Sequence, residues 1–138
     1  MIEIQPYDPA HFDGVDRLWR EVFPNDPPRN QAGSAIPVKL SLKDGLFWVA
    51  IEREDAVVGT IMAGWDGHRG WLYSVAVDPH KQRAGIGRQL VEHAVQELRR
   101  RGCGKVNLQI RAGNDAVEAF YAKLGFQTEA RISMGREV

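Results

Sequence analysis

The chain has 138 residues, of which 43% are hydrophobic, and its 18 lysine and arginine residues balance 18 aspartate and glutamate residues. This length predicts a single domain, residues 1–138, whose core needs no disulfide or metal to be stable. The formal net charge of zero argues against a dedicated nucleic-acid-binding or membrane-surface protein, because both usually carry a basic excess.

The single cysteine, Cys103, excludes an intrachain disulfide, and we expect it to be a small, partly buried loop residue rather than a reactive thiol. The N-terminal segment MIEIQPYDPAHFDG has no basic stretch followed by an apolar run, so we expect no secretion signal. No apolar run approaches the ~20 residues that a membrane span needs. The expected location is the cytoplasm.

The first predicted elements are a short strand over Ile2–Gln5 and a helix from about Pro9 to Phe23. Asp8 is a favourable N-cap, and proline suits the first helical position. Apolar residues then recur at helical spacing at Phe12, Val15, Leu18, Trp19 and Val22.

A loop rich in proline, asparagine and glycine follows the first helix. After this loop, Ser34 is expected to cap a short helix through Leu42, with Pro37 in its first turn.

Three strands are predicted next, because β-branched and aromatic residues are separated by polar turns. They cover Leu46–Glu52, Val57–Trp65 and Trp71–Val77. The first two form a hairpin, the segment DGHRG makes the second turn, and Asp78-Pro79 ends the third strand because proline cannot continue a β-ladder.

The second half of the sequence alternates helices with strands. A helix over Arg88–Arg101 ends in three arginines and Gly102, which suit the negative end of the helix dipole and a left-handed C-cap. A strand is predicted over Lys105–Arg111, a helix from Asn114 or Asp115 to about Leu124, and a last strand over Phe126–Met134. A run of strands followed by alternation predicts an α/β (α+β) fold with a mixed sheet.

The segment QRAGIG, residues 82–87, lies between a predicted strand and a predicted helix and has the properties of an anion site. Gly85 and Gly87 lack side chains, so backbone N–H groups can approach a ligand closely. The first N–H groups of the helix have no intrahelical partners and carry the positive end of the dipole, so a pyrophosphate fits there. Arg83 and Arg88 can add positive charge.

Two other phosphate-binding motifs are excluded by spacing. The loop lacks the G-x-x-x-x-G-K-[ST] pattern of a P-loop, and it lacks G-x-G-x-x-G after a first strand, the pattern typical of dinucleotide folds. On pattern alone, a tight turn before a helix explains the loop equally well.

The segment NDAVEAFYAKLGF, residues 114–126, places Tyr121 late in a predicted helix. A tyrosine hydroxyl beside a sulfur leaving group can serve as a general acid. From spacing alone the alternative is favoured, in which Phe120, Tyr121 and Leu124 form a core stripe.

Together these two segments resemble the GNAT superfamily of N-acetyltransferases. The matching stretches are the strand Ser74–Pro79, the loop Gln82–Gly87 and the segment Asn114–Phe126 with its Y-x-x-x-G-F ending. The resemblance implies a GNAT-like mixed, mostly antiparallel central sheet with helices on both faces and splayed strands at the CoA site. It also implies acetyl-CoA as co-substrate, without a metal.

The resemblance assigns roles to particular positions. It implies that the CoA pyrophosphate binds the loop and helix start, at Gln82, Arg83, Ala84, Gly85, Ile86, Gly87 and Arg88. The pantetheine arm is expected along Val75, Ala76 and Val77, with Asn114 touching the arm. Tyr121 is expected to protonate the leaving thiolate, and the N–H of Val75 to stabilise the oxyanion.

The general base is not identified by the resemblance. Relatives that acetylate ribosomal-protein N-termini are similar between Ser74 and Phe126 and use a glutamate where this chain has Gln109, and an amide cannot take a proton. The other candidates are Asp66, His68, Tyr73 and Glu118, although Asp66 and His68 are better explained as turn residues.

The acceptor pocket is expected between the first helix, the region 24–45 and the strand edges. Four aromatic residues are candidates for its lining, although each is better explained as a core or rim residue: Trp19, Phe23, Trp48 and Trp65. We expect a site that is open or is completed by a second copy of the chain in a homodimer. The acceptor is expected to be a small amine; a protein lysine or N-terminus, and a non-catalytic acyl-CoA-binding module, are the alternatives.

Overall fold

The computed structural model describes residues 1–82 and 84–138. They form two compact units, Met1–Leu108 and Gln109–Val138. Of the predicted site residues, only Arg83 lies outside the described part of the chain.

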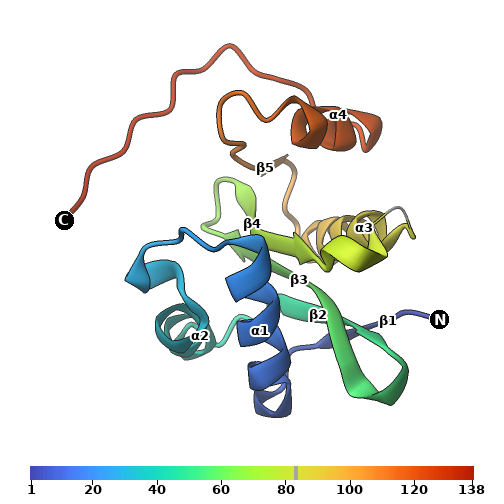
Figure 1. Ribbon diagram of the computed structural model, residues 1–138. Helices are drawn as coiled ribbons and strands as arrows, with labels where there is room; N and C mark the ends of the chain where they lie inside the picture. Colours follow the sequence, from blue (N-terminus) through green and yellow to red (C-terminus); the bar gives the residue numbers. More distant parts are fainter. Residues whose placement is uncertain (83) are drawn as a thin grey trace. The chain divides into compact units, whose positions relative to one another are not determined.

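The first unit is built on a five-stranded mixed sheet (Figure 1). The strands follow one another in chain order: β1 (Glu3–Pro6), β2 (Phe47–Glu52), β3 (Ala56–Trp65), β4 (Gly70–Val77) and β5 (Val106–Asn107). Neighbours from β1 to β4 are antiparallel, and β5 runs parallel to β4. The predicted mixed, mostly antiparallel sheet is confirmed.

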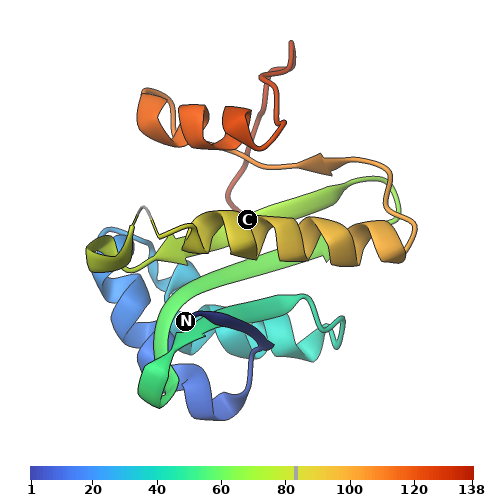
Figure 2. The same ribbon diagram turned by 90° about the vertical axis from the view of Figure 1, so that its right-hand side faces the viewer.

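Helices cover both faces of this sheet. Figures 1 and 2 show α1 (Phe12–Val22) and α2 (Ala32–Ser41) on one face and α3 (Ile86–Arg100) on the other.

Strand β2 contributes side chains to the cores on both faces of the sheet, because alternate side chains of a strand point to opposite faces. Phe47 lies 6.2 Å from the ring of Trp19 in α1, whereas Trp48 meets His93 of α3 edge-on at 5.1 Å. The continuous apolar run of β2 is thus explained by burial on both faces.

Helix α1 forms where the sequence predicts it. The carboxylate of Asp8 accepts from the N–H of Ala10 at 2.9 Å, and a 3₁₀ turn over Pro9–His11 leads into the helix. Val15, Leu18 and Trp19 are buried along one stripe. Capping and amphipathic spacing therefore agree, and the predicted helix is confirmed.

The start of α2 corrects the predicted role of Ser34. The first helical bonds run from the N–H groups of Ser34 and Ala35 to the carbonyl of Gln31, which is the N-cap residue. Ser34 therefore lies inside the helix, and Pro37 lies beyond its first turn. The buried side chains of Ala32 and Ile36, one turn apart, extend the helix toward its N-terminus.

The arginines at the end of α3 have structural partners. Arg100 and Arg101 both pair with Glu97, at 3.1 and 3.0 Å, and Arg101 also donates to the carbonyl of Asp44 at 2.7 Å. Gly102 has φ 101°, in agreement with the predicted left-handed C-cap.

Cys103 is buried, with its thiol 3.2 Å from the Lys105 carbonyl, so the expected loop position is confirmed.

The second unit contains one helix, α4 (Asp115–Lys123), capped by the side chain of Asn114 as predicted. Two predicted strands are wrong in extent. The strand over Lys105–Arg111 is reduced to Val106–Asn107, and Phe126–Met134 forms no strand. A strand needs a hydrogen-bonded neighbour, and Ile132 and Met134 are almost fully exposed, with no apolar face to hold one. Among the described residues, no helix is long and apolar enough to cross a membrane.

Candidate active site

Helix α3 follows β4, and its N-terminus is not capped by the side chain of any residue that the structure describes. Gly85 is the N-cap residue, with φ 79° and no side-chain hydrogen bond to the helix. The first helical bond runs from Gln89 N–H to Gly85 C=O at 3.0 Å. The amides of residues 86–88 therefore have no intrahelical acceptor, and they lie at the positive end of the dipole. An anion such as a pyrophosphate can take these donors.

Helix α3 begins at Ile86, two residues before the predicted start at Arg88. The reason is packing, since Ile86 is only 2% exposed and anchors the first turn on the sheet. Gly59 in β3 permits this approach. A Cβ there would lie 2.9 Å from Leu90 Cδ1 and 3.1 Å from Ile86 Cγ2, so both side chains would have to shift to make room for it. Ile86 can therefore offer a ligand only its backbone N–H.

The remaining predicted loop residues lie at the surface. Gln82, Ala84, Gly85 and Arg88 are exposed. The loop start is held in place by Asp78, whose N–H donates to the Val58 carbonyl at 2.8 Å and whose carboxylate accepts from the N–H of His80 at 2.9 Å. These bonds fix the backbone at Asp78 and His80, just before the predicted anion site.

Strand β4 carries a bulge at Ser74, which sequence analysis did not predict. Thr60 pairs with Ala76 and Met62 pairs with Tyr73, so Ser74 and Val75 together oppose the single residue Ile61. Ser74 has φ 51°, in the left-handed region that favours glycine. The bulge changes the direction of the backbone amides midway along the strand.

Beyond Trp71, one edge of β4 is not paired with β5. The parallel pairing joins Gly70 to Val106 and Trp71 to Asn107 and extends no further within the described residues. Residues 72–77, which include the predicted Val75, Ala76 and Val77, therefore offer backbone groups to a ligand that binds as an added strand.

In the second unit, Tyr121 is 7% exposed and lies edge-on to Phe120 and Phe126, with ring centroids 5.0 and 5.6 Å apart. Burial raises the pKa of the Tyr121 hydroxyl to about 12. At neutral pH the hydroxyl is therefore protonated and can donate. The Asn114 side-chain oxygen accepts from Val117 N–H at 3.3 Å, which leaves its NH₂ group for a ligand.

Two of the candidate bases, Asp66 and Glu118, already accept hydrogen bonds within the chain. The Asp66 carboxylate accepts from the N–H groups of Arg69 and His68, and these bonds hold its pKa below the usual value. It is a turn-forming residue and a poor base. Glu118 accepts from the Thr128 hydroxyl at 2.8 Å, and the Gln109 side chain donates to the Ser133 hydroxyl.

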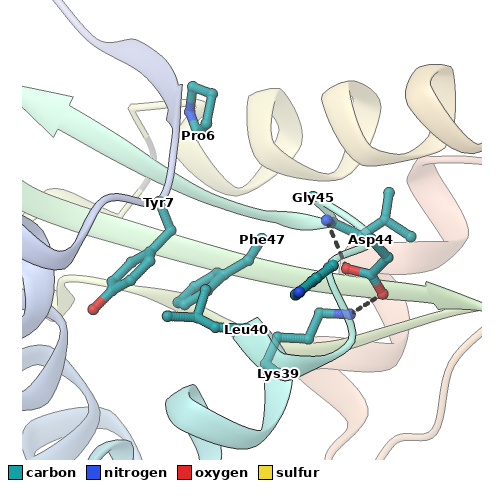
Figure 3. Close-up of a pocket in the computed structure, with 9 residues that line it drawn as sticks. Pro6, Tyr7, Lys39, Leu40, Asp44, Gly45 and Phe47 are labelled. Carbon is teal, nitrogen blue, oxygen red and sulfur yellow. Dashed lines mark hydrogen bonds and ion pairs between the residues drawn. The ribbon is translucent and has the colours of Figure 1, made fainter.

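A cavity of about 280 Å³ lies between the ends of β1, α2 and β2 (Figure 3). Tyr7, Leu40 and Phe47 line its apolar side, and the Lys39–Asp44 ion pair lies on the other. None of the four aromatic residues proposed for an acceptor pocket lines it. Trp19 and Trp48 are core residues, 4% exposed, as the alternative interpretation held.

The Lys39–Asp44 pair is mostly withdrawn from solvent. Lys39 Nζ lies 2.9 Å from Asp44 Oδ2, and the side chains of Lys39 and Asp44 are 4% and 26% exposed. The Lys39 ammonium also donates to the Ala63 carbonyl and lies 5.3 Å from the centroid of the Tyr73 ring. The pair joins the end of α2 to β3 and β4, and no sequence signal predicted it.

Replacing Asp44 with alanine is expected to lower the free energy of unfolding by about 2–4 kcal/mol, because it leaves the Lys39 ammonium buried without a counter-charge. Urea denaturation measures the loss. Asp16→Ala is a matched control: Asp16 is 28% exposed, but its partner Arg20 is 78% exposed. The control should cost about 0.3–0.5 kcal/mol. Equal losses in the two variants would contradict a structural role for the buried pair.

One group within the described residues has the ligand types of a metal site: Glu21, Asp78 and His80, whose ligand atoms lie within 4.8 Å of one another. His80 lies 3.7 Å from Glu21, and both side chains are largely exposed. The backbone N–H of His80 already occupies one Asp78 oxygen. The expected independence from metal remains a prediction.

Comparison with known proteins decides the family. The sequence profile of the acetyltransferase (GNAT) family matches residues 12–126. An acetyltransferase of Yersinia enterocolitica is 36% identical over 137 residues, covering 99% of this chain and 96% of that protein. This chain belongs to the GNAT family. An acetyltransferase of Pectobacterium atrosepticum is also 36% identical over the same shares of the two chains. The predicted activity class, N-acetyltransferase, is confirmed.

Solved structures with the GNAT fold match along nearly the whole chain. The ribosomal-protein-S18-alanine N-acetyltransferase of Escherichia coli has a TM-score of 0.76 at 24% identity, covering 94% of this chain and 80% of that one. AAC(6')-Iy, in complex with a bisubstrate analogue of CoA, has a TM-score of 0.80 at 15% identity, covering 100% and 99%. The predicted fold class is confirmed.

Proposed function

We propose that this GNAT enzyme transfers the acetyl group of acetyl-CoA to a primary amine of a small molecule by direct attack. The observation that carries the donor assignment is the course of β4. Within the described residues its pairing with β5 ends at Trp71, it is bulged at Ser74, and it is followed by α3, whose N-cap residue Gly85 makes no side-chain hydrogen bond. The pantetheine arm of CoA is extended, contains amides and ends in a pyrophosphate. It can therefore bind along the edge of β4 as an added strand would, with its pyrophosphate at the amides that begin α3.

The roles proposed for the residues follow from the charge on the pyrophosphate and from the negative charge that develops on the carbonyl oxygen and the sulfur. The amides at the start of α3, with Arg88 and Arg83, hold the pyrophosphate, while Val75 to Val77 and Asn114 hold the pantetheine arm. As the amine nitrogen bonds to the thioester carbon, negative charge develops on the carbonyl oxygen, and the Val75 N–H stabilises it. The carbon–sulfur bond then breaks, and Tyr121 donates its hydroxyl proton to the departing sulfur. The amine loses one proton to a general base.

The choice of a small amine rests on Gln109. This position carries an amide, which cannot take a proton, where the resemblance to N-terminal protein acetyltransferases implies a glutamate. Protein acetylation is the second candidate, because the S18-alanine enzyme has the same fold.

We further propose that residues 1–138 act as one domain, since the family profile spans both units. The proposed location is the cytoplasm, where the free thiol of Cys103 stays reduced.

The donor assignment is tested by titration calorimetry with acetyl-CoA, with free CoA and ATP as controls. We expect micromolar binding of both CoA species and none of ATP at the same concentrations. A thiol-release assay then compares two acceptor sets, small polyamines and amino compounds in one and peptides with free N-termini or lysines in the other. Turnover with peptides alone would overturn the small-amine assignment. Absence of binding to either CoA species would overturn the donor assignment.

The expected homodimer needs a separate measurement. Light scattering at assay concentration gives the mass of the particle in solution. A strict monomer that is active would remove the hypothesis that a second copy completes the acceptor site.

A further inference from the structure

A buried chain of hydrogen bonds runs from α1 through β3 to the bulge in β4. The indole N–H of Trp19 donates to the Thr60 hydroxyl at 2.9 Å, and this hydroxyl donates to the Ser74 carbonyl, also at 2.9 Å. Trp19 is 4% exposed and Thr60 is not exposed at all. Among the described residues, Thr60 and Lys39 are the two buried polar side chains, so Thr60 has been placed in the core despite its hydroxyl.

The direction of these bonds is fixed by chemistry. An indole N–H can only donate, so the Thr60 oxygen must accept from Trp19 with a lone pair. The Thr60 proton is then left for a different partner, and the Ser74 carbonyl is 2.9 Å away. Without Trp19, the Thr60 hydroxyl could rotate between acceptors. The indole therefore sets the direction in which Thr60 donates.

The Ser74 carbonyl and the Val75 N–H belong to the same peptide group. A trans peptide is planar, and its C=O and N–H point in opposite directions. Because the carbonyl is bonded to Thr60, the Val75 N–H must point away from Thr60. Ser74 has φ 51° without being glycine, so its conformation needs support from its surroundings. The Thr60 hydroxyl supplies one such contact at the bulge.

We propose that Thr60 and Trp19 are positioning residues that orient the Val75 N–H for the thioester oxygen. This inference rests on the proposed acetyl transfer. Neither side chain is required to touch acetyl-CoA. Trp19 acts on Thr60, Thr60 acts on the Ser74 carbonyl, and the planar peptide transmits the constraint to the N–H. The same two hydrogen bonds could serve folding alone, so the test must observe the thioester carbonyl itself.

The test compares Thr60→Val with Thr60→Ser. Valine has nearly the shape of threonine but no hydroxyl, whereas serine keeps the hydroxyl and loses a methyl group. Acetyl-CoA labelled with ¹³C at the carbonyl is bound to each protein, and isotope-edited infrared spectroscopy gives the carbonyl stretching frequency. We expect the parent and Thr60→Ser to lower this frequency relative to free acetyl-CoA, and Thr60→Val to return it toward the free value. The dissociation constant should be unchanged in both variants.

Once an acceptor is known, kcat gives a second readout. Thr60→Val should lower kcat by about 10–100-fold, less than the ~10²–10³-fold effect of removing an oxyanion-hole donor, because the N–H is misdirected rather than lost. The KM for acetyl-CoA should stay constant. Thr60→Ser should recover most of the rate. A merely structural role predicts that the loss of kcat in each variant follows its loss of thermal stability.

The outcomes separate the two proposals. Unchanged carbonyl frequency in a folded Thr60→Val protein that binds acetyl-CoA overturns the positioning role and leaves the proposed function intact. Failure of the parent to bind acetyl-CoA overturns both. If Thr60→Val does not fold, Trp19→Phe decides, because it removes the indole N–H and keeps Thr60. The positioning role then requires a carbonyl frequency between those of the parent and free acetyl-CoA, and a parental frequency overturns it.

Discussion

Replacing Tyr121 with phenylalanine is expected to lower kcat by about 10²–10⁴-fold, the range for losing a positioned general acid. The change removes one oxygen from a side chain that is 7% exposed and keeps the ring that meets Phe120 and Phe126. The protein should therefore fold normally and bind acetyl-CoA with an unchanged dissociation constant. Single-turnover release of the CoA thiol measures the effect.

The size of the loss has a mechanistic meaning. Burial raises the pKa of Tyr121 to about 12, whereas a thiol such as that of cysteine has a pKa of about 8.5. The hydroxyl is thus a weak acid toward a thiolate, although it remains a good hydrogen-bond donor. A loss of about 10²–10³-fold matches donation to developing charge, and a larger loss points to proton transfer in the transition state.

Tyr7→Phe is the control for this substitution. It removes the hydroxyl of a second tyrosine whose pKa burial also raises and whose ring stacks on Phe47 at 4.4 Å. This variant should keep parental turnover. If Tyr121→Phe also keeps parental turnover in a folded, acetyl-CoA-binding protein, the general-acid role is wrong, and such a result would agree with a non-catalytic binding module.

A pH titration of stability provides an independent check on Tyr121. An unfolded tyrosine ionises near pH 10, whereas the folded chain holds the proton until about pH 12. The stabilising contribution of the protonated hydroxyl is complete below pH 10 and is lost as the pH rises through about 12. Thermal denaturation from pH 9 to 11.5 should therefore show a steeper decline for the parent than for Tyr121→Phe. Parallel curves would contradict the raised pKa.

The sequence predicted those parts of the fold that local chemistry determines. Asp8 with Pro9 started the 3₁₀ turn that leads into α1, Asp78 with Pro79 ended β4, and Gly102 ended α3, because each acts on its own backbone. The elements that depended on distant partners were misjudged. The segment Phe126–Met134 has partly the composition of a strand, yet no strand among the described residues pairs with it. Helix α3 starts early because Ile86 packs on a sheet that the local sequence does not show.

In the candidate site too, features with a local sequence signal were predicted, and features that depend on distant residues were missed. The glycines of residues 82–87 marked the helix N-terminus, and the Y-x-x-x-G-F ending marked Tyr121. The bulge was missed because Ser74 adopts a left-handed backbone conformation without glycine or asparagine to signal it. Its supporting contact comes from the Thr60 hydroxyl, and Thr60 is in turn bonded to Trp19, 41 residues earlier in the chain. Each of those residues looks like an ordinary core residue on its own, so only the folded chain connects them to the N–H of Val75.

Gly85→Glu is expected to weaken acetyl-CoA binding by at least about 100-fold. It places a carboxylate at the N-terminus of α3, where the free amides would otherwise meet the pyrophosphate. Like charges at a binding site cost several kcal/mol, and each 1.4 kcal/mol is tenfold in affinity. Calorimetric titration measures the change, and raising the salt concentration should recover part of the affinity through screening.

Backbone strain must be separated from this electrostatic effect, since Gly85 has φ 79° and any side chain there is strained. Gly67→Glu is the matched control. Gly67 has φ 89°, is exposed and has open space around it, as Gly85 does, but it lies in the turn between β3 and β4. The control should lose similar thermal stability and keep parental affinity. Gly85→Ala, which adds strain without charge, should weaken binding far less than Gly85→Glu. Equal losses of affinity in all three variants would show that strain alone is responsible, and the turn would then be a structural connection rather than the pyrophosphate site.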